Sequence, residues 1–164
     1  MSKIQITAFN GEYRFLSNYY PCPVTIDGLT YRNAEAAFQA AKCDDPVDRA
    51  SFCTLPPNVA KAIGRKIKLR EGWENERDGI MADIIHAKFA QNPTLAQALI
   101  DTGDADLIEG NTWNDNYWGV CECARCRSEG IKGQNKLGQI LMAERKALTA
   151  TPISSEELKD GELH

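Results

Sequence analysis

The clearest pattern of apolar and polar positions lies in residues 31–43, which read YRNAEAAFQAAKC. Asn33 is a good N-cap, because its side-chain oxygen can accept a hydrogen bond from a main-chain amide of the first helical turn. An apolar stripe then repeats with the helical period, at Ala34, Ala37, Phe38 and Ala41. Three polar residues at i, i+4 and i+7 share a neighbouring face: Glu35, Gln39 and Lys42. This face is either a solvated surface, as charged helical positions usually are, or the wall of a polar cleft.

Shorter elements precede this helix. Residues 3–9 alternate apolar and polar side chains and predict a strand. Residues 24–26 and 29–31 are β-prone runs around Asp27-Gly28, a pair that tolerates positive φ, so they predict a hairpin. Residues 13–20 are rich in aromatic and polar side chains without a period, which suggests an irregular binding loop.

Apolar periodicity predicts further helices downstream, over residues 47–54, 58–64, 73–91, about 95–102 and about 140–148. In the 58–64 helix, Asn58 is expected to be the N-cap, and Val59, Ala62 and Ile63 are expected to face the core. Residues 107–110 predict one more short strand. The expected fold class is α+β, a mainly helical single domain over residues 1–148 with a small antiparallel sheet or hairpin, followed by a polar C-terminal tail over residues 149–164.

The charge of the chain limits its partners. Its 164 residues carry a formal net charge of −4, so there is no overall basic field of the kind that duplex-binding proteins use. The apolar runs are short and the N-terminus lacks the apolar region of a signal peptide, so we expect a cytoplasmic protein without a membrane partner. The oligomeric state is left open.

Two features around residue 70 each have two interpretations. Residues 65–70 contain four cations, including Arg65 and Arg70, and form either a solvated edge or a docking site for phosphate. Trp73 begins the long helix, where it either staples that helix to its neighbours or projects into a cleft.

Residues 111–119, NTWNDNYWG, form the most unusual stretch of the chain. They combine amides, one carboxylate and aromatic rings without a helical or strand period. Rings stack on planar groups while acids and amides bind hydroxyls, so this composition suits a planar ligand joined to a sugar. The alternative is a loop packed by its own tryptophans.

Three cysteines follow this loop within six residues, at Cys121, Cys123 and Cys126. They resemble part of a structural zinc site, for which Cys22 or another residue would supply the fourth ligand. The alternative is a reduced surface loop.

Several blocks together resemble the NADAR family of YbiA-like N-glycosidases. They are residues 15–18 (FLSN), 35–42 (EAAFQAAK), 60–65 (AKAIGR), 69–73 (LREGW), 87–89 (AKF), 114–119 (NDNYWG) and 133–138 (GQNKLG). The resemblance spans about residues 9–146 and departs from the family pattern at residues 121–130, where YbiA-type members have a short glycine-rich link. That departure bears on substrate choice.

The resemblance implies hydrolysis of an N-glycosidic bond between ribose C1 and a nitrogenous leaving group. YbiA-type members act on phosphoribosylamino-pyrimidine intermediates of riboflavin synthesis, and other members remove ADP-ribose from guanine bases of DNA. By motif, the resemblance implies a catalytic set of Glu35, Trp73, Asp115 and Trp118. The associated substrate-binding candidates are Phe15, Ser17, Asn18, Gln39, Lys42, Arg65, Arg70 and Asn135.

Breaking a ribosyl C–N bond passes through an oxocarbenium-like state, which a carboxylate can stabilise while it activates water. We therefore expect Glu35 to do both, and Asp115 to anchor ribose hydroxyls or share the acid/base work. No cofactor is required by this scheme, apart from the possible structural zinc. The rival from another class is a module that binds ADP-ribose or NAD without hydrolysing it.

Overall fold

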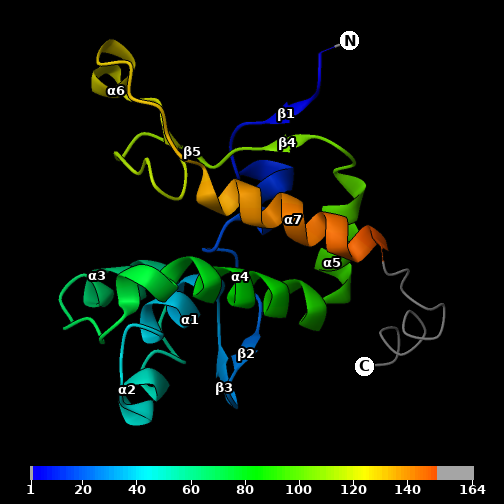
Figure 1. Cartoon of the computed structure of the whole chain (residues 1–164). Coiled ribbons are helices and arrows are strands. Elements are labelled where there is room, and N and C mark those ends of the chain that lie inside the picture. Colours follow the sequence, from blue (N-terminus) through cyan, green and yellow to red (C-terminus); the bar gives the residue numbers. More distant parts are fainter. Residues whose placement is uncertain (1, 151–164) are drawn as a thin grey trace.

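The computed structural model describes residues 2–150 of the chain. Helix α4 (Trp73–Gln91) lies at the centre and packs against α1 (Ala34–Ala40), strand β2 (Val24–Ile26) and α7 (Lys136–Ala150). In Figure 1, α7 runs above α4, and α5 (Pro93–Asp101), which follows α4, packs against both at one end. The buried side of α4 carries Met81, Ile84, Ile85 and Phe89, which form the middle of the core.

The strands form three separate pairs. The predicted hairpin is confirmed at its predicted boundaries, with β2 antiparallel to β3 (Leu29–Tyr31) and positive φ at Asp27 and Gly28. Strand β1 (Gln5–Ile6) pairs in parallel with β4 (Asp106–Leu107). Strand β5 (Gly110–Asn111) pairs in parallel with β6 (Val120–Cys121). The predicted strand over residues 3–9 was therefore too long, because β1 pairs over only two residues. The predicted strand over residues 107–110 was wrong, because this segment runs from the end of β4 to the start of β5. The α+β class with a mainly helical domain is confirmed.

Helix α1 is more deeply buried than its periodicity predicts. Asn33 caps it as expected and accepts a hydrogen bond from the amide of Ala36 at 2.7 Å. All seven residues of the helix are buried, including Glu35 and Gln39. The polar face is therefore interior, and its solvated interpretation is wrong.

Helix α3 (Pro57–Gly64) corrects two predictions. Pro56 occupies the N-cap position in place of Asn58, and Ala60 and Gly64 are the buried residues. The expected core residues Val59 and Ile63 are 37% and 40% exposed, and Ala62 is exposed too. The cause is close packing of α3 on α1, since a Cβ built on Gly64 would lie 1.9 Å from Gln39 Oε1. Only the smallest residues fit between these helices.

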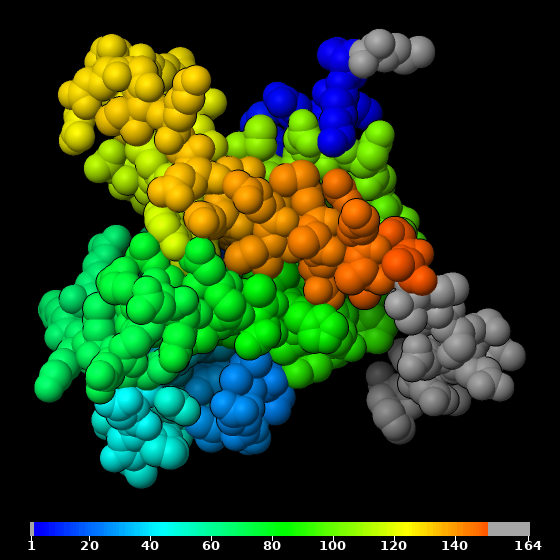
Figure 2. Space-filling model, viewed as in Figure 1, coloured from blue at the N-terminus to red at the C-terminus, as the bar shows by residue number. Residues whose placement is uncertain are grey.

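The remaining helices are short or peripheral. Helix α2 (Pro46–Ala50) is shorter than the predicted 47–54, and a 3-10 helix (Gly11–Leu16) occupies part of the predicted irregular segment. Helix α6 (Ala124–Ser128) projects from the body of the molecule, as the space-filling view shows in yellow (Figure 2). Helix α7 continues two residues past the predicted domain end, and the predicted tail from residue 151 lies outside the described residues. Between residues 2 and 150, no helix has the length and apolar character needed to cross a membrane.

Candidate active site

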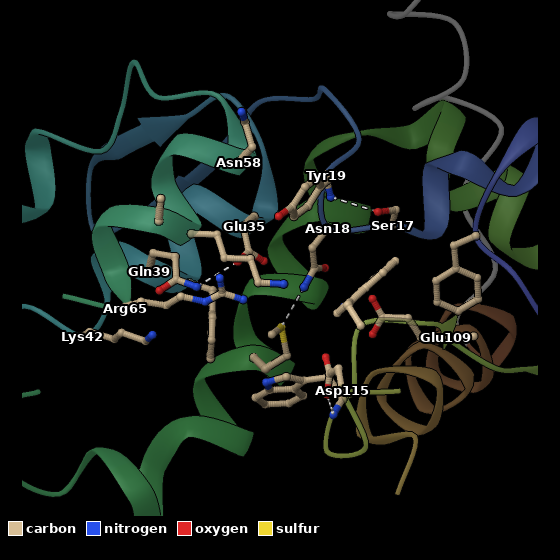
Figure 3. Close-up of a pocket in the computed structure, with 18 residues that line it drawn as sticks. Ser17, Asn18, Tyr19, Glu35, Gln39, Lys42, Asn58, Arg65, Glu109 and Asp115 are labelled. Atoms are coloured by element: carbon tan, nitrogen blue, oxygen red, sulfur yellow. Dashed lines mark hydrogen bonds between the residues drawn. The ribbon is translucent and has the colours of Figure 1, made fainter. Parts of the chain in front are cut away.

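A cavity of about 570 Å³ lies between α1, α3 and the loop of residues 111–119. Three carboxylates line it: Glu35, Glu109 and Asp115. Figure 3 shows Glu35 and Gln39 on one side, with Glu109 and Asp115 on the other. The acid of the buried helix and the acid of the tryptophan-rich loop therefore share one chamber.

Glu35 lies in the first turn of α1, where the Asn33 cap and the helix N-terminus fix its main chain. Its Oε1 accepts a hydrogen bond from Gln39 Nε2 at 2.8 Å. Burial raises the pKa of Glu35, while the Gln39 hydrogen bond, Lys61 and Lys42 oppose that rise and Asp115 adds to it. Glu35 is thus an acid with a raised pKa and a fixed orientation.

Glu109 follows β4 and was not predicted. Its Oε2 is shielded from solvent and has no hydrogen-bond partner among residues 2–150. Burial, with Asp115 and Glu35, raises its pKa to about 7, while Lys61 opposes the rise. A carboxyl with this pKa can hold a proton near neutral pH.

Asp115 is held by its own loop. Asn111 donates from Nδ2 to the carbonyl of Asp115 at 2.8 Å and accepts from its amide at 3.1 Å. One carboxylate oxygen of Asp115 accepts from the amides of Tyr117 at 3.1 Å and Trp118 at 2.9 Å. These four bonds fix the carboxylate at the cavity wall.

Cations and rings complete the lining. Lys42, Lys61 and Arg65 all line the cavity. Burial lowers the pKa of Lys42, and the charge of Glu35 opposes that effect. The ammonium of Lys61 lies 5.9 Å from the ring centres of both Tyr19 and Trp113, so it stands between two aromatic side chains of the lining.

Several lining atoms lack hydrogen bonds. Among the described residues, four buried side-chain nitrogen and oxygen atoms have no partner in the protein, and three of them belong to lining residues. These are Asn18 Oδ1, Gln39 Oε1 and Glu109 Oε2. All three are oxygens, but Gln39 Oε1 lies against Gly64 of α3. The two that suit ligand donors such as hydroxyl or amino groups are Asn18 Oδ1 and Glu109 Oε2.

A family model for the NADAR domain matches residues 7–149. The chain belongs to the NADAR domain family. N-glycosidase YbiA of Escherichia coli (strain K12) is 34% identical over 148 residues, which are 88% of this NADAR chain and 88% of YbiA. Riboflavin biosynthesis protein VVA0006 of Vibrio vulnificus is 35% identical over 141 residues, which are 84% of this chain and 36% of that protein. The NMR structure of the E. coli protein YbiA aligns with a TM-score of 0.75 and 30% identity, covering 100% of this chain and 92% of that one.

Most site residues predicted for the NADAR chain line the cavity: Glu35, Asp115, Trp118, Ser17, Asn18, Gln39, Lys42 and Arg65. The others lie outside the lining: Phe15, Arg70, Trp73 and Asn135. Trp73 is buried and packs against Phe38 in a tilted arrangement, with ring centres 5.2 Å apart, so the staple interpretation describes its contacts. Its ring also lies 5.8 Å from the ammonium of Lys42, and so Trp73 supports two lining residues from behind.

The other three have structural contacts that explain their positions. Arg70 points away, donating to the carbonyl of Ala41 at 2.9 Å and pairing with Glu76 at 2.6 Å. The predicted cationic run of residues 65–70 is thus split, because Arg65 reaches the cavity and Arg70 does not. Phe15 is buried, and its carbonyl accepts from the buried Lys88 ammonium at 2.6 Å.

Asn135 supports the site through Glu109. Its Oδ1 accepts from the amide of Glu109 at 3.0 Å, and its Nδ2 donates to the carbonyl of Leu107 at 2.9 Å. Asn135 therefore holds the main chain of residues 107–109 and so orients Glu109. The sequence analysis missed two charged residues of the lining, Glu109 and Lys61. Glu109 could have been found as an acid that ends an apolar run just before the tryptophan-rich loop. Lys61 could have been found as a cation one helical turn before Arg65.

The cysteines of this NADAR chain form a cluster that could hold a metal ion. The sulfur atoms of Cys121, Cys123 and Cys126 all lie within 4.8 Å of one another. Cys22 is not part of this cluster and is buried in the main core, so it is not the fourth ligand. None of the three clustered cysteines lines the cavity as residues 2–150 define it.

Proposed function

We propose that this protein is an N-glycosidase that hydrolyses the ribosyl C–N bond of phosphoribosylamino-pyrimidine intermediates of riboflavin biosynthesis. The observation that carries the proposal is that Glu35 and Asp115 line one cavity. Three cations, Lys42, Lys61 and Arg65, line the same cavity. Carboxylates suit a ribosyl cation and cations suit the 5′-phosphate of the same substrate. Relatives named as N-glycosidases and as a riboflavin biosynthesis protein support the reaction and the substrate class.

Glu35 and Glu109 divide the proton transfers in this proposal. Glu35 has a hydrogen-bond donor in Gln39 and two nearby cations, all of which favour its ionised form. Glu109 Oε2 has no such donor among the described residues, and the pKa of Glu109 is raised to about 7, so we assign the proton-donor role to Glu109. Paired carboxyls whose environments separate their proton affinities are suited to acid and base roles.

The proposed reaction replaces the C1–N bond of the substrate by a C1–O bond to water. The C1–N bond breaks, its electron pair goes to the leaving nitrogen, and that nitrogen takes the proton of Glu109. Water adds to the oxocarbenium carbon and gives a proton to the Glu35 carboxylate. Exchange with solvent returns the proton to Glu109 and removes it from Glu35.

Other residues position the substrate. Asp115 anchors ribose hydroxyls, because one of its oxygens is already engaged by two main-chain amides and its orientation is fixed. Trp118 covers the sugar or the leaving base, and Trp73 is a positioning residue that acts through Phe38 and Lys42. A zinc ion on the cysteine cluster would be structural, since its ligands lie outside the cavity lining.

A second candidate substrate is ADP-ribosylated guanine in DNA. Trp113, which lines the cavity, is 61% exposed and lies beside Lys61. An exposed ring next to a cation can stack on a neighbouring base of a single strand. The net charge of −4 favours the small substrate.

The deciding experiment offers both substrates to the purified chain side by side and measures the released base and sugar phosphate. Rapid release from the phosphoribosylamino-pyrimidine supports the proposal, and release only from the modified oligonucleotide supports the second candidate. Glu35→Gln is expected to lower kcat at least about a thousandfold while keeping the fold. Glu71→Gln, at an exposed position, is the matched control. Binding of ADP-ribose without turnover of either substrate would show a non-catalytic module instead.

A further inference from the structure

The cysteine cluster has the geometry of a metal site. Cys121 ends β6, Cys123 caps α6, and Cys126 lies in the first turn of α6. Their sulfur atoms lie within 4.8 Å of one another. Tetrahedral zinc holds sulfurs about 2.3 Å from the ion, which places them about 3.8 Å apart. Small side-chain rotations would therefore bring all three onto one ion.

Each sulfur also accepts a nitrogen donor. The amide of Asn114 donates to Cys121 Sγ at 3.3 Å, and the amide of Cys126 donates to Cys123 Sγ at 3.4 Å. The Asn116 side chain donates to Cys126 Sγ at 3.4 Å. Such donors stabilise negative charge on sulfur and orient the ligands around a metal. Cys126 also donates to Asn114 Oδ1 at 3.4 Å, a contact that loss of the thiol proton would release.

Helix α6 has little else to hold it in place. It has only five residues, and Cys126 is its one buried side chain. Helices shorter than about 12 residues are marginal without tertiary support. A metal is one of the devices that stabilise segments too small to build an apolar core. All six cysteines are free, so no disulfide performs this role.

The cluster is joined to the active-site loop on both sides of Asp115. Asn114 and Asn116 supply two of the three donors to sulfur, and Asp115 lies between them with its carboxylate at the cavity. Asn116 Oδ1 also accepts from the amide of Cys121 at 3.0 Å. Whatever fixes the sulfurs thus fixes the main chain that presents Asp115.

We propose that Cys121, Cys123 and Cys126 bind one zinc ion, which clasps the loop of residues 111–119 and holds Asp115 in the cavity. Within residues 2–150 no fourth His, Cys, Asp or Glu joins the cluster, so the fourth position takes water or another donor.

Metal content tests the first half of the proposal. The full chain, made without a histidine tag and purified without chelator, is expected to carry about one zinc ion. Cys123→Ser is expected to lose it, whereas Cys53→Ser, which removes a half-buried thiol outside the cluster, keeps it. Cobalt added to the metal-free wild type should give intense thiolate-to-cobalt absorption. This test uses only the wild-type chain, so it does not depend on whether a cysteine variant folds. A wild-type chain that binds neither zinc nor cobalt under reducing conditions overturns the proposal.

Amide hydrogen exchange tests the clasp. Removing zinc from the wild type is expected to speed exchange in residues 111–119 about tenfold or more, with α4 unchanged. Equal exchange in that loop with and without zinc would show that the ion does not hold it. Neither measurement uses glycosidase activity, so failure here leaves the proposed function standing, and failure of that function leaves the metal site standing.

Discussion

Gln39 donates a hydrogen bond to Glu35 across one helical turn and keeps its own carbonyl oxygen buried and unpartnered. The bond is possible because Gly64 of α3 leaves room for the amide. Gln39 thus orients the proposed base, while its own carbonyl oxygen lies against Gly64. The geometry of the site depends on a residue that has no side chain.

Gly64→Ala is therefore expected to disturb catalysis. Its Cβ would lie 1.9 Å from Gln39 Oε1, so the amide must move and release Glu35. We expect kcat/KM to fall about tenfold or more and the free energy of unfolding to fall by about 1–3 kcal/mol.

Gly79→Ala is the matched control, since a Cβ at this position of α4 meets nothing within 4 Å. It should raise the free energy of unfolding by about 0.5–1 kcal/mol and leave activity unchanged. If Gly64→Ala lost stability but kept full activity, Gln39 would have no role in orienting Glu35.

Glu109 makes stability depend on pH. Its pKa rises from 4.5 to about 7 on folding, so between these values the folded state binds more protons than the unfolded state. The stability that protonation of Glu109 contributes is therefore fully present below about pH 4.5 and is lost as the pH rises through about 7. Glu109→Gln is expected to raise the free energy of unfolding by about 3 kcal/mol at about pH 8 and to change it little at about pH 4.

Urea denaturation of the wild type and Glu109→Gln at both pH values measures this difference. Glu71→Gln, at an exposed position, should show no such pH dependence. An equal effect of Glu109→Gln at the two pH values would mean that the carboxyl has an ordinary pKa in the folded protein.

The pH dependence of the rate tests the acid role of Glu109 separately. If protonated Glu109 supplies the leaving nitrogen with its proton, kcat/KM falls as the pH rises above about 7. Glu109→Gln should lower kcat and remove this limb of the profile. A profile whose alkaline limb survives in that variant would assign the proton donor to another group.

The phosphate site can be tested by comparing two substrates. Lys61→Ala and Arg65→Ala are each expected to raise KM for the phosphorylated substrate about tenfold, because each removes a charged partner of the phosphate. The dephosphorylated substrate should show no such change. Lys66→Ala, an exposed neighbour outside the cavity lining, is the control. Equal effects on both substrates would place the phosphate elsewhere.

Local sequence chemistry was enough to place several elements. The Asp27-Gly28 turn fixed the hairpin, because few dipeptides tolerate two positive φ angles. Asn33 fixed the start of α1 for a similarly local reason. The resemblance to the NADAR family then selected Glu35 and Asp115, for which the residue pattern had left both a structural and a ligand-binding interpretation open.

Contacts between distant segments were beyond the sequence pattern. Ala60 and Gly64 face inward because α1 lies against them, whereas hydrophobicity favoured Val59 and Ile63. The parallel pairing of β1 with β4 involves two residues on each side, too few to leave a period. Glu109 was missed for the same reason, since its burial comes from its surroundings and not from its neighbours in sequence.

Two unpartnered oxygens of lining residues, Asn18 Oδ1 and Glu109 Oε2, also bear on inhibitor design. A five-membered iminosugar, with a protonated nitrogen near the position of the anomeric carbon, offers hydroxyl donors to these oxygens and a cation to the carboxylates. Such a compound mimics the charge of the reacting sugar, while a neutral carbocyclic analogue offers only the hydroxyls. We therefore expect the protein to bind a small polyhydroxylated amine more tightly than its neutral carbocyclic analogue.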